Sequence, residues 1–143
     1  ADDTKLQTLA GDKGVIKLLV NCLVNGVENA QIVKWSTWAL INLVYEHPPN
    51  KRELFLKGGL DHLIAGARRH TSSTAVFQQC VALLLTMIAY DQHTKMNQSV
   101  ARQSCLANGI FEVLQEGKKN APDNQELHDM VDQVLKLLIS DWS

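Results

Sequence analysis

The chain has 143 residues, of which 45% are hydrophobic and 20% charged, and its formal net charge is −1 at pH 7. This composition is typical of a soluble globular domain with a sizeable core, and three prolines with eight glycines leave little room for a turn-rich all-β fold. The near-neutral charge argues against a nucleic-acid-binding protein, and no apolar run approaches the roughly 20 residues that a membrane span needs.

The charge is unevenly distributed along the chain. Residues 47–111 carry a net charge of +4, and residues 112–143 carry −4. Such a distribution is either ordinary scatter over solvated helix faces or a means of selecting a partner by electrostatic complementarity. The sequence leaves both interpretations open.

The first residues and the cysteines bear on the compartment. The acidic start Ala1-Asp2-Asp3-Thr4 lacks a hydrophobic region and an initial Met, so we expect a fragment or a processed form rather than a signal peptide. Cys22, Cys80 and Cys105 are odd in number and widely separated, which indicates reduced thiols rather than a disulfide framework. We therefore expect an intracellular, cytoplasmic protein and leave the nucleus open.

In chain order, the first clear prediction is a long helix from Ala30 to about Tyr45, capped by Asn29. The pair Pro48-Pro49 ends the preceding segment, because the residue before a proline disfavours helical backbone angles. Asn50 is expected to cap a short helix, with Glu53 close to the capping-box position.

Helical patterns continue downstream, and no period-2 pattern of a strand competes with them. A polar break at residues 71–74 separates two of these helices, and Pro122-Asp123 opens the last one. The predicted helices span residues 60–69, 75–90, about 95–107 and from Pro122-Asp123 to about 140.

A glycine-anchored pattern recurs three times along the chain. Each copy has a glycine, an apolar residue, two variable positions and an apolar pair, and the copies are 45 and then 50 residues apart. These spacings lie near the range of helical solenoid repeats. The copies are Gly14-Val15-Ile16-Lys17-Leu18-Leu19, Gly59-Leu60-Asp61-His62-Leu63-Ile64 and Gly109-Ile110-Phe111-Glu112-Val113-Leu114.

The same register extends into the three long helices and predicts their core. Core positions are expected 18, 22, 25, 26 and 29 residues after each glycine. An open superhelix explains three copies in one register better than a closed bundle does. The predicted core residues are Ile32, Phe77 and Leu127; Ser36, Val81 and Val131; Ala39-Leu40, Leu84-Leu85 and Val134-Leu135; and Leu43, Ile88 and Leu138.

The run Trp38-Ala39-Leu40-Ile41-Asn42-Leu43, with Ile32 and Ser36 before it, resembles the third helix of an armadillo repeat. The segment 50–59 looks like the first helix of the next repeat. HEAT repeats are the nearest alternative, but they have two helices per unit and lack the glycine and the Trp-to-Asn pair. The resemblance implies an all-α, right-handed superhelical solenoid of three armadillo-like repeats, at about residues 4–46, 50–91 and 96–141. These would form one domain over residues 1–143, which can be part of a longer array.

In armadillo proteins the third helices line a concave groove, where Asn side chains hold the backbone of an extended peptide and Trp side chains form pockets. The resemblance carries these roles to Trp38 and Asn42. An amide can pair with both groups of a peptide unit, and an indole offers an apolar wall and a cation–π partner. The matching second-repeat positions hold Leu83 and Met87, which are either adaptable groove residues or core residues. The predicted partner-binding residues are Lys34, Trp38, Asn42, Tyr45, Gln79, Leu83, Met87 and Tyr90.

The sequence contains no pattern typical of catalysis or metal binding. It lacks H-E-x-x-H, C-x-x-C and phosphate-binding glycine motifs. His93 and His128 are expected to be solvated, and Cys80 falls on a buried stripe as a structural thiol. We therefore expect neither an enzyme nor a cofactor or metal site.

The predicted function is a scaffold that binds a protein or peptide partner, as an extended or partly helical segment, in the concave groove. One alternative is a structural module that stacks or oligomerises through its terminal repeat faces, with Trp142 as a candidate contact. Another is a nucleic-acid binder whose affinity falls steeply with salt. Its contacts would be Lys51, Arg52, Arg68 and Arg69.

Overall fold

A computed structural model describes residues 3–89 and 98–139 of the chain. All regular secondary structure in these residues is α-helical, which confirms the all-α class. None of the described helices is long and apolar enough to cross a membrane. The helices are α1 (Asp3–Asp12), α2 (Val15–Asn25), α3 (Ala30–Val44), α4 (Pro48–Leu56), α5 (Gly59–Arg69), α6 (Thr74–Ile88), α7 (Gln98–Ala107), α8 (Ile110–Asn120) and α9 (Gln125–Ile139).

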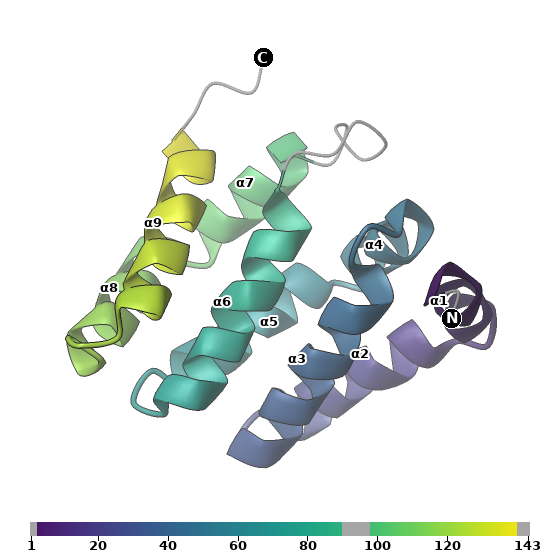
Figure 1. Cartoon of the computed structure of the whole chain (residues 1–143), viewed down its shortest axis with the longest axis horizontal. Coiled ribbons are helices and arrows are strands. Elements are labelled where there is room, and N and C mark those ends of the chain that lie inside the picture. The colour runs from purple at the N-terminus through teal and green to yellow at the C-terminus, as the bar shows by residue number, and fades with distance from the viewer. Residues whose placement is uncertain (1–2, 90–97, 140–143) are drawn as a thin grey trace.

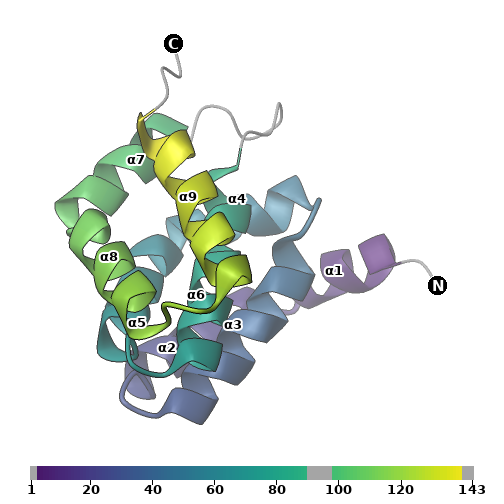
Figure 2. The same cartoon turned by 60° about the vertical axis from the view of Figure 1, so that its left-hand side comes forward.

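The helices recur as a short, a medium and a long one. The medium helices α2, α5 and α8 have 11 residues each, and the long helices α3, α6 and α9 have 15 each. Figure 1 shows the long helices side by side in one layer, with the medium helices behind them. The turned view in Figure 2 shows α8 and α5 beside α9 and α6 as the second layer. The short helices lie toward the end at which the long helices terminate.

A glycine with left-handed backbone angles joins each short helix to its medium helix. These residues are Gly14 (φ 78°), Gly58 (φ 73°) and Gly109 (φ 66°). Only glycine adopts such angles without a steric penalty from a Cβ atom. The prediction that Gly59 is the equivalent of Gly14 is therefore wrong, because Gly59 is the first residue of α5 and Gly58 makes the turn.

This shift also corrects the predicted core of α3. Of the predicted core residues of α3, Ser36 and Leu40 are buried, whereas Ile32 is 38% exposed. The fully buried row of α3 is Val33, Thr37, Leu40 and Val44. They match Phe77, Val81, Leu84 and Ile88 of α6 with a spacing of 44 residues, not 45. The spacing of 50 residues from α6 to Leu127, Val131, Val134 and Leu138 of α9 agrees with the prediction.

The helix caps follow the sequence only in part. Asn29 caps α3 as predicted, since its Oδ1 accepts from the backbone N–H of Gln31 (3.0 Å) and Ile32 (3.3 Å). Asn50 does not cap α4. The two prolines stand at the first helical positions, where no N–H is needed, and His47 becomes the cap. The helix predicted from residue 95 is described only from Gln98, and the last helix begins at Gln125 rather than at Pro122.

Side chains of the long helices pack on glycines of the following medium helix. A Cβ atom added at Gly117 of α8 would overlap the buried ring of Phe77 from α6. At Gly66 of α5 the nearest atom is Cγ1 of Val33, from α3, at an ordinary 3.5 Å. Of these two contacts between the layers, the one at Gly117 is therefore the closer.

We predict opposite effects of alanine at these two helical glycines. Gly117→Ala lowers the free energy of unfolding by about 1–3 kcal/mol, because Phe77 has no room to retreat. Gly66→Ala raises it by about 0.5–1 kcal/mol, because alanine favours the helix and fits the space. Urea unfolding followed by circular dichroism measures both. Equal effects of the two substitutions would contradict the close approach at Gly117.

Candidate functional site

The outer side of α3 carries an uncharged stripe of exposed side chains. Its members follow one another at spacings of four, three, four and three residues, which keeps them on one side of a helix. All of them are exposed in the structure, and the last is the C-cap of α3. They are Gln31, Trp35, Trp38, Asn42 and Tyr45.

Two tryptophans dominate this stripe. Trp35 is 61% and Trp38 is 53% exposed, and their ring centroids are 6.1 Å apart at an interplanar angle of 88°. This edge-to-face geometry is favourable for aromatic pairs, but it leaves both indoles largely in solvent. Trp35 was missed by the sequence analysis, although its spacing to Trp38 and Asn42 could have indicated it.

The equivalent stripes of α6 and α9 have different chemistry. The α6 stripe is partly or fully exposed, uncharged and mostly small: Ala75, Gln79, Ala82, Thr86 and Ala89. The α9 stripe is exposed and mainly polar or charged: Gln125, Asp129, Asp132, Lys136 and Ile139. Since the three long helices lie side by side (Figure 1), the stripes form one surface, here called the third-helix face.

The structure places the other predicted groove residues as follows. Leu83 and Met87 are 1% and 2% exposed, so they belong to the core and cannot line an accessible groove. The one-residue error in register is the reason, because one residue rotates a helix position by about 100°. Lys34 and Gln79 are partly buried, Tyr45 is 59% exposed, and Tyr90 lies outside the described residues.

Asn42 does not belong to a row of amides. Its Nδ2 donates to the carbonyl oxygen of Trp38 at 3.2 Å. The equivalent residues are Thr86 on α6 and Lys136 on α9. No level of the third-helix face carries an amide on all three long helices.

A hollow of about 990 Å³ lies where α3 and α6 end, beside the start of α4. Tyr45, Thr86 and Ala89 of the third-helix face contribute to its wall. The buried side chain of Lys51 donates from Nζ to the carbonyl of Ala89 at 3.2 Å, which satisfies the end of α6. The lining residues are Val44, Tyr45, Glu46, Pro48, Pro49, Lys51, Arg52, Leu85, Thr86 and Ala89.

Side chains from α1 and α4 fix the end of α3 beside this hollow. Gln7 Nε2 donates to the carbonyls of Asn42 (3.0 Å) and Tyr45 (2.8 Å), and Asn50 Nδ2 donates to that of Leu43 (2.9 Å). His47 is buried and accepts at Nδ1 from the backbone N–H of Asn50, at 3.2 Å. The carbonyls that a helix end leaves open are thus used, and the wall of the hollow is held in place.

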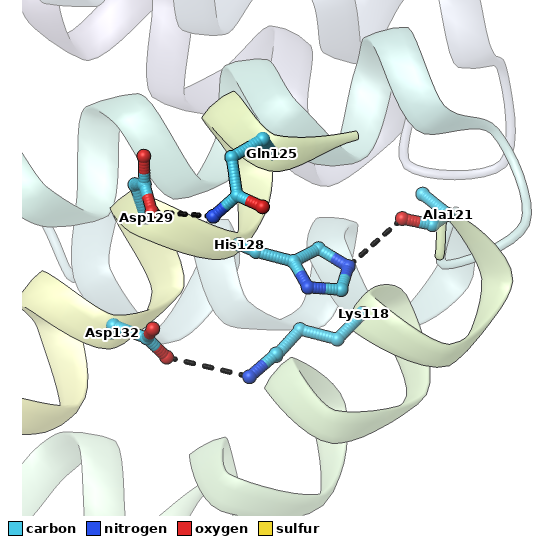
Figure 3. A network of polar contacts seen from close by, with 6 residues as sticks. All are labelled: Lys118, Ala121, Gln125, His128, Asp129 and Asp132. Atoms are coloured by element: carbon cyan, nitrogen blue, oxygen red, sulfur yellow. Dashed lines mark hydrogen bonds and ion pairs between the residues drawn. The ribbon is translucent and has the colours of Figure 1, made fainter. Parts of the chain in front are cut away.

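Figure 3 shows polar contacts of the first half of α9, two of which reach α8 or the residue that follows it. Lys118 Nζ lies 3.3 Å from Asp132 Oδ1, and His128 Nε2 donates to the carbonyl of Ala121 at 2.9 Å. Gln125 Nε2 donates to Asp129 Oδ1 at 2.8 Å. The expectation that His128 is solvated is therefore wrong, because it joins the two helices; His93 lies outside the described residues.

The cations proposed for nucleic-acid binding do not form one patch. Lys51 is buried at the end of α3 and α6. Arg69 pairs with Glu28, just before α3, and Arg68 donates to the carbonyl of Asn108. Lys51 and the Arg69–Glu28 pair lie at opposite ends of α3, whose 15 residues span about 22 Å.

The cysteines differ in exposure and protonation. Burial raises the pKa of the Cys80 thiol to about 12. Burial, together with the charge of Asp61, raises the pKa of the Cys105 thiol to about 12. Cys22 is exposed. Among the described residues, no group of three or more His, Cys, Asp or Glu side chains is placed to hold a metal ion.

We predict that a thiol reagent titrates one cysteine quickly in the folded chain. Cys22 is accessible, whereas Cys80 and Cys105 are buried and neutral. The pKa values of these two thiols in the folded chain exceed the unfolded value of about 8.5. Above that pH the unfolded chain loses thiol protons that the folded chain keeps, so the free energy of unfolding falls as the pH rises. Absorbance with a disulfide reagent counts the reacting thiols, and Cys22→Ser should abolish the fast phase. Two fast-reacting thiols per chain would contradict the burial.

No protein-family model, curated protein or solved structure matches this chain.

Proposed function

We propose that this chain is a non-enzymatic protein-interaction module that binds a polypeptide segment on the third-helix face. We also propose that its helices form a right-handed, armadillo-like solenoid of three repeats. The resemblance of the Trp38 to Leu43 run to an armadillo third helix supports this architecture. The recurrence of a short, a medium and a long helix is consistent with it.

The exposed pair Trp35 and Trp38 is the observation that carries the proposed function. A large aromatic side chain in solvent forgoes the free energy of burial, about 25 cal/mol per Å² of apolar surface. Two of them, touching one another on an uncharged stripe, form the kind of surface that marks interaction sites. Tryptophan and tyrosine are also enriched among residues that dominate binding energy.

The support beneath this surface suits a binding site. The end of α3 is held by Gln7 and Asn50, and α6 is held by Lys51. A surface fixed in this way loses little conformational entropy on association, which favours affinity. The adjoining hollow offers a place for a bulky side chain of the partner.

Replacement of both tryptophans tests the proposal. We expect Trp35→Ala with Trp38→Ala to reduce the capture of partner proteins from a lysate at least tenfold, since such anchors contribute about 2 kcal/mol or more. Quantitative mass spectrometry of the bound fraction measures the loss. Both side chains are more than half exposed, so the free energy of unfolding should change by only about 0.5 kcal/mol.

The matched control is Leu56→Ala with Phe111→Ala, which removes two other exposed apolar side chains, on α4 and α8. These residues lie outside the third-helix face, so capture should be unchanged. Equal capture by the tryptophan variant and the wild type would contradict the proposal, as would an equal loss in the control.

A specific observation also favours the second candidate, stacking through a terminal face. Gly66 and Gly117 are the eighth residues of α5 and α8, and each receives a side chain of the preceding long helix. The eighth residue of α2 is Cys22, which is exposed. If a further long helix packed on α2 as α3 packs on α5, its contact would therefore be the face around Cys22. Trp142, the other candidate contact, lies outside the described residues.

If the chain stacks in this way, its mass by light scattering should rise with concentration. Cys22→Arg should return it to the monomer, because a long cation cannot fit where the other units carry glycine. Asn21→Arg, on a neighbouring exposed position, is the control and should leave the mass unchanged. A constant monomer mass of the wild type would exclude stacking.

A further inference from the structure

The middle of the third-helix face is lined by short side chains. On α6 the outward residues are alanine or threonine at four of five positions, Gln79 being the fifth. On one side stand Trp35, Trp38 and Tyr45 of α3, and on the other stand the longer, charged side chains of α9. Short side chains let the backbone of a packed helix approach, and helix axes in contact lie about 8–10 Å apart.

The uncharged stripe on α3, which contains Trp35, Trp38 and Tyr45, has the residue spacing along which a second helix can pack. Alternation of four and three residues is the seam along which one helix packs beside another at a small crossing angle. The seam runs the length of α3, from Gln31 to Tyr45. A partner that used all of it would lie lengthwise, beside α3 and above α6.

An extended segment across the three long helices finds little that would hold its backbone. Such a segment needs paired donors and acceptors at regular intervals, but no level of the face repeats an amide, and Asn42 already donates to Trp38. The described residues also contain no strand whose edge it could extend. A helix satisfies its own backbone and needs only side-chain contacts.

The two sides of α6 differ in charge. Glu126 and Asp129 are exposed on α9, and their helical positions place them on its outer side toward α6. Helix α3 carries no carboxylate, and its one charged residue is Lys34. A partner lying over α6 would therefore meet an aromatic wall on the α3 side and, on the α9 side, two carboxylates in the first turns of α9. Lys136, the one cation of the α9 stripe, lies farther along the helix, so the negative charge is concentrated where α9 begins.

We infer that the segment bound on the third-helix face is an amphipathic helix of about four turns that lies lengthwise over α6. Its apolar side packs on Trp35, Trp38 and Tyr45, and its basic side faces Glu126 and Asp129. A bulky apolar residue at one end enters the hollow beside Ala89. This inference rests on the proposed function and specifies the class of partner.

Selection from a library tests the partner class without a known ligand. Random 18-residue segments are displayed, selected on the wild-type chain and counter-selected on the Trp35→Ala, Trp38→Ala variant. We expect enriched sequences with apolar residues at spacings of three and four and with Lys or Arg along one flank. Enriched segments without a helical period, or with an acidic flank, would overturn the inference and leave the proposed function standing. If no segment distinguishes the two chains, the proposed function fails as well.

The orientation is tested with the best synthetic segment and two single substitutions. Ala75 and Ala89 stand at opposite ends of the α6 stripe, about 21 Å apart along the helix. A lengthwise helix covers both, so Ala75→Trp and Ala89→Trp should each weaken binding at least tenfold in calorimetry. Ala65→Trp, at an exposed position of α5, is the control and should have no effect. Weakening by only one of the two α6 substitutions would show that the segment crosses the helices.

The charge complementarity is tested with a pair of double variants. Glu126→Gln with Asp129→Asn should weaken the same segment about threefold to tenfold, since exposed charge pairs contribute modestly, and should reduce the salt dependence of binding. The control, Glu112→Gln with Asp123→Asn, removes two exposed carboxylates outside the third-helix face. If both double variants bind the segment with equal affinity, the inference that the partner has a basic flank is wrong.

Discussion

The packing of α6 between α3 and α9 is the constraint on which the rest of the structure depends. Besides the buried row that begins with Phe77, α6 buries a second row: Val76, Cys80, Leu83 and Met87. The equivalent row of α3 is less buried, since Ile32 is exposed, Ala39 and Leu43 are partly buried and only Ser36 is buried, and no long helix precedes α3 in the described part of the chain. The second row of α6 is therefore the side that packs against α3.

This packing determines what remains for the surface. Because both flanks of α6 are largely covered, its exposure to solvent is concentrated on the outer stripe, with Gln78 and Leu85 partly exposed beside it, and that stripe is small and uncharged. The long helices have equal length and lie in one layer. Their surface chemistry nevertheless changes from aromatic through small to charged. Shared core positions give these helices one architecture, and the stripes give each its own surface, where a specific function resides.

Two of the short helices also satisfy backbone groups at the ends of the long helices. Helices α1 and α4 supply side chains that donate to carbonyl oxygens where the long helices end: Gln7 and Asn50 at α3, and Lys51 at α6. A buried carbonyl without a partner costs about 1–3 kcal/mol, so these contacts couple the short helices to the long ones. The hollow is consequently bounded by elements that hold one another in place.

Local patterns in the sequence were sufficient for the helical class, for the Asn29 cap, and for the bounds of α5 and the long helices to within a few residues, since spacing and capping act within one helix. They also singled out Trp38 and Asn42, which the structure leaves exposed. The repeat pattern assigned the junction glycine to the wrong member of the pair Gly58-Gly59. Either glycine can adopt left-handed angles, and which one does so depends on how Leu60 and Ile64 reach the core.

The left-handed angles at Gly58 rather than Gly59 shift the register by one residue. Leu83 and Met87, which the sequence allowed as groove or core residues, are therefore core residues. The sequence by itself determined which helices form, because helix formation depends on neighbours along the chain. The tertiary structure alone decided which side of each helix is buried and brought Trp35, the small stripe of α6 and the hollow together. Burial depends on neighbours in space, and in this chain many of those neighbours lie more than forty residues away in the sequence.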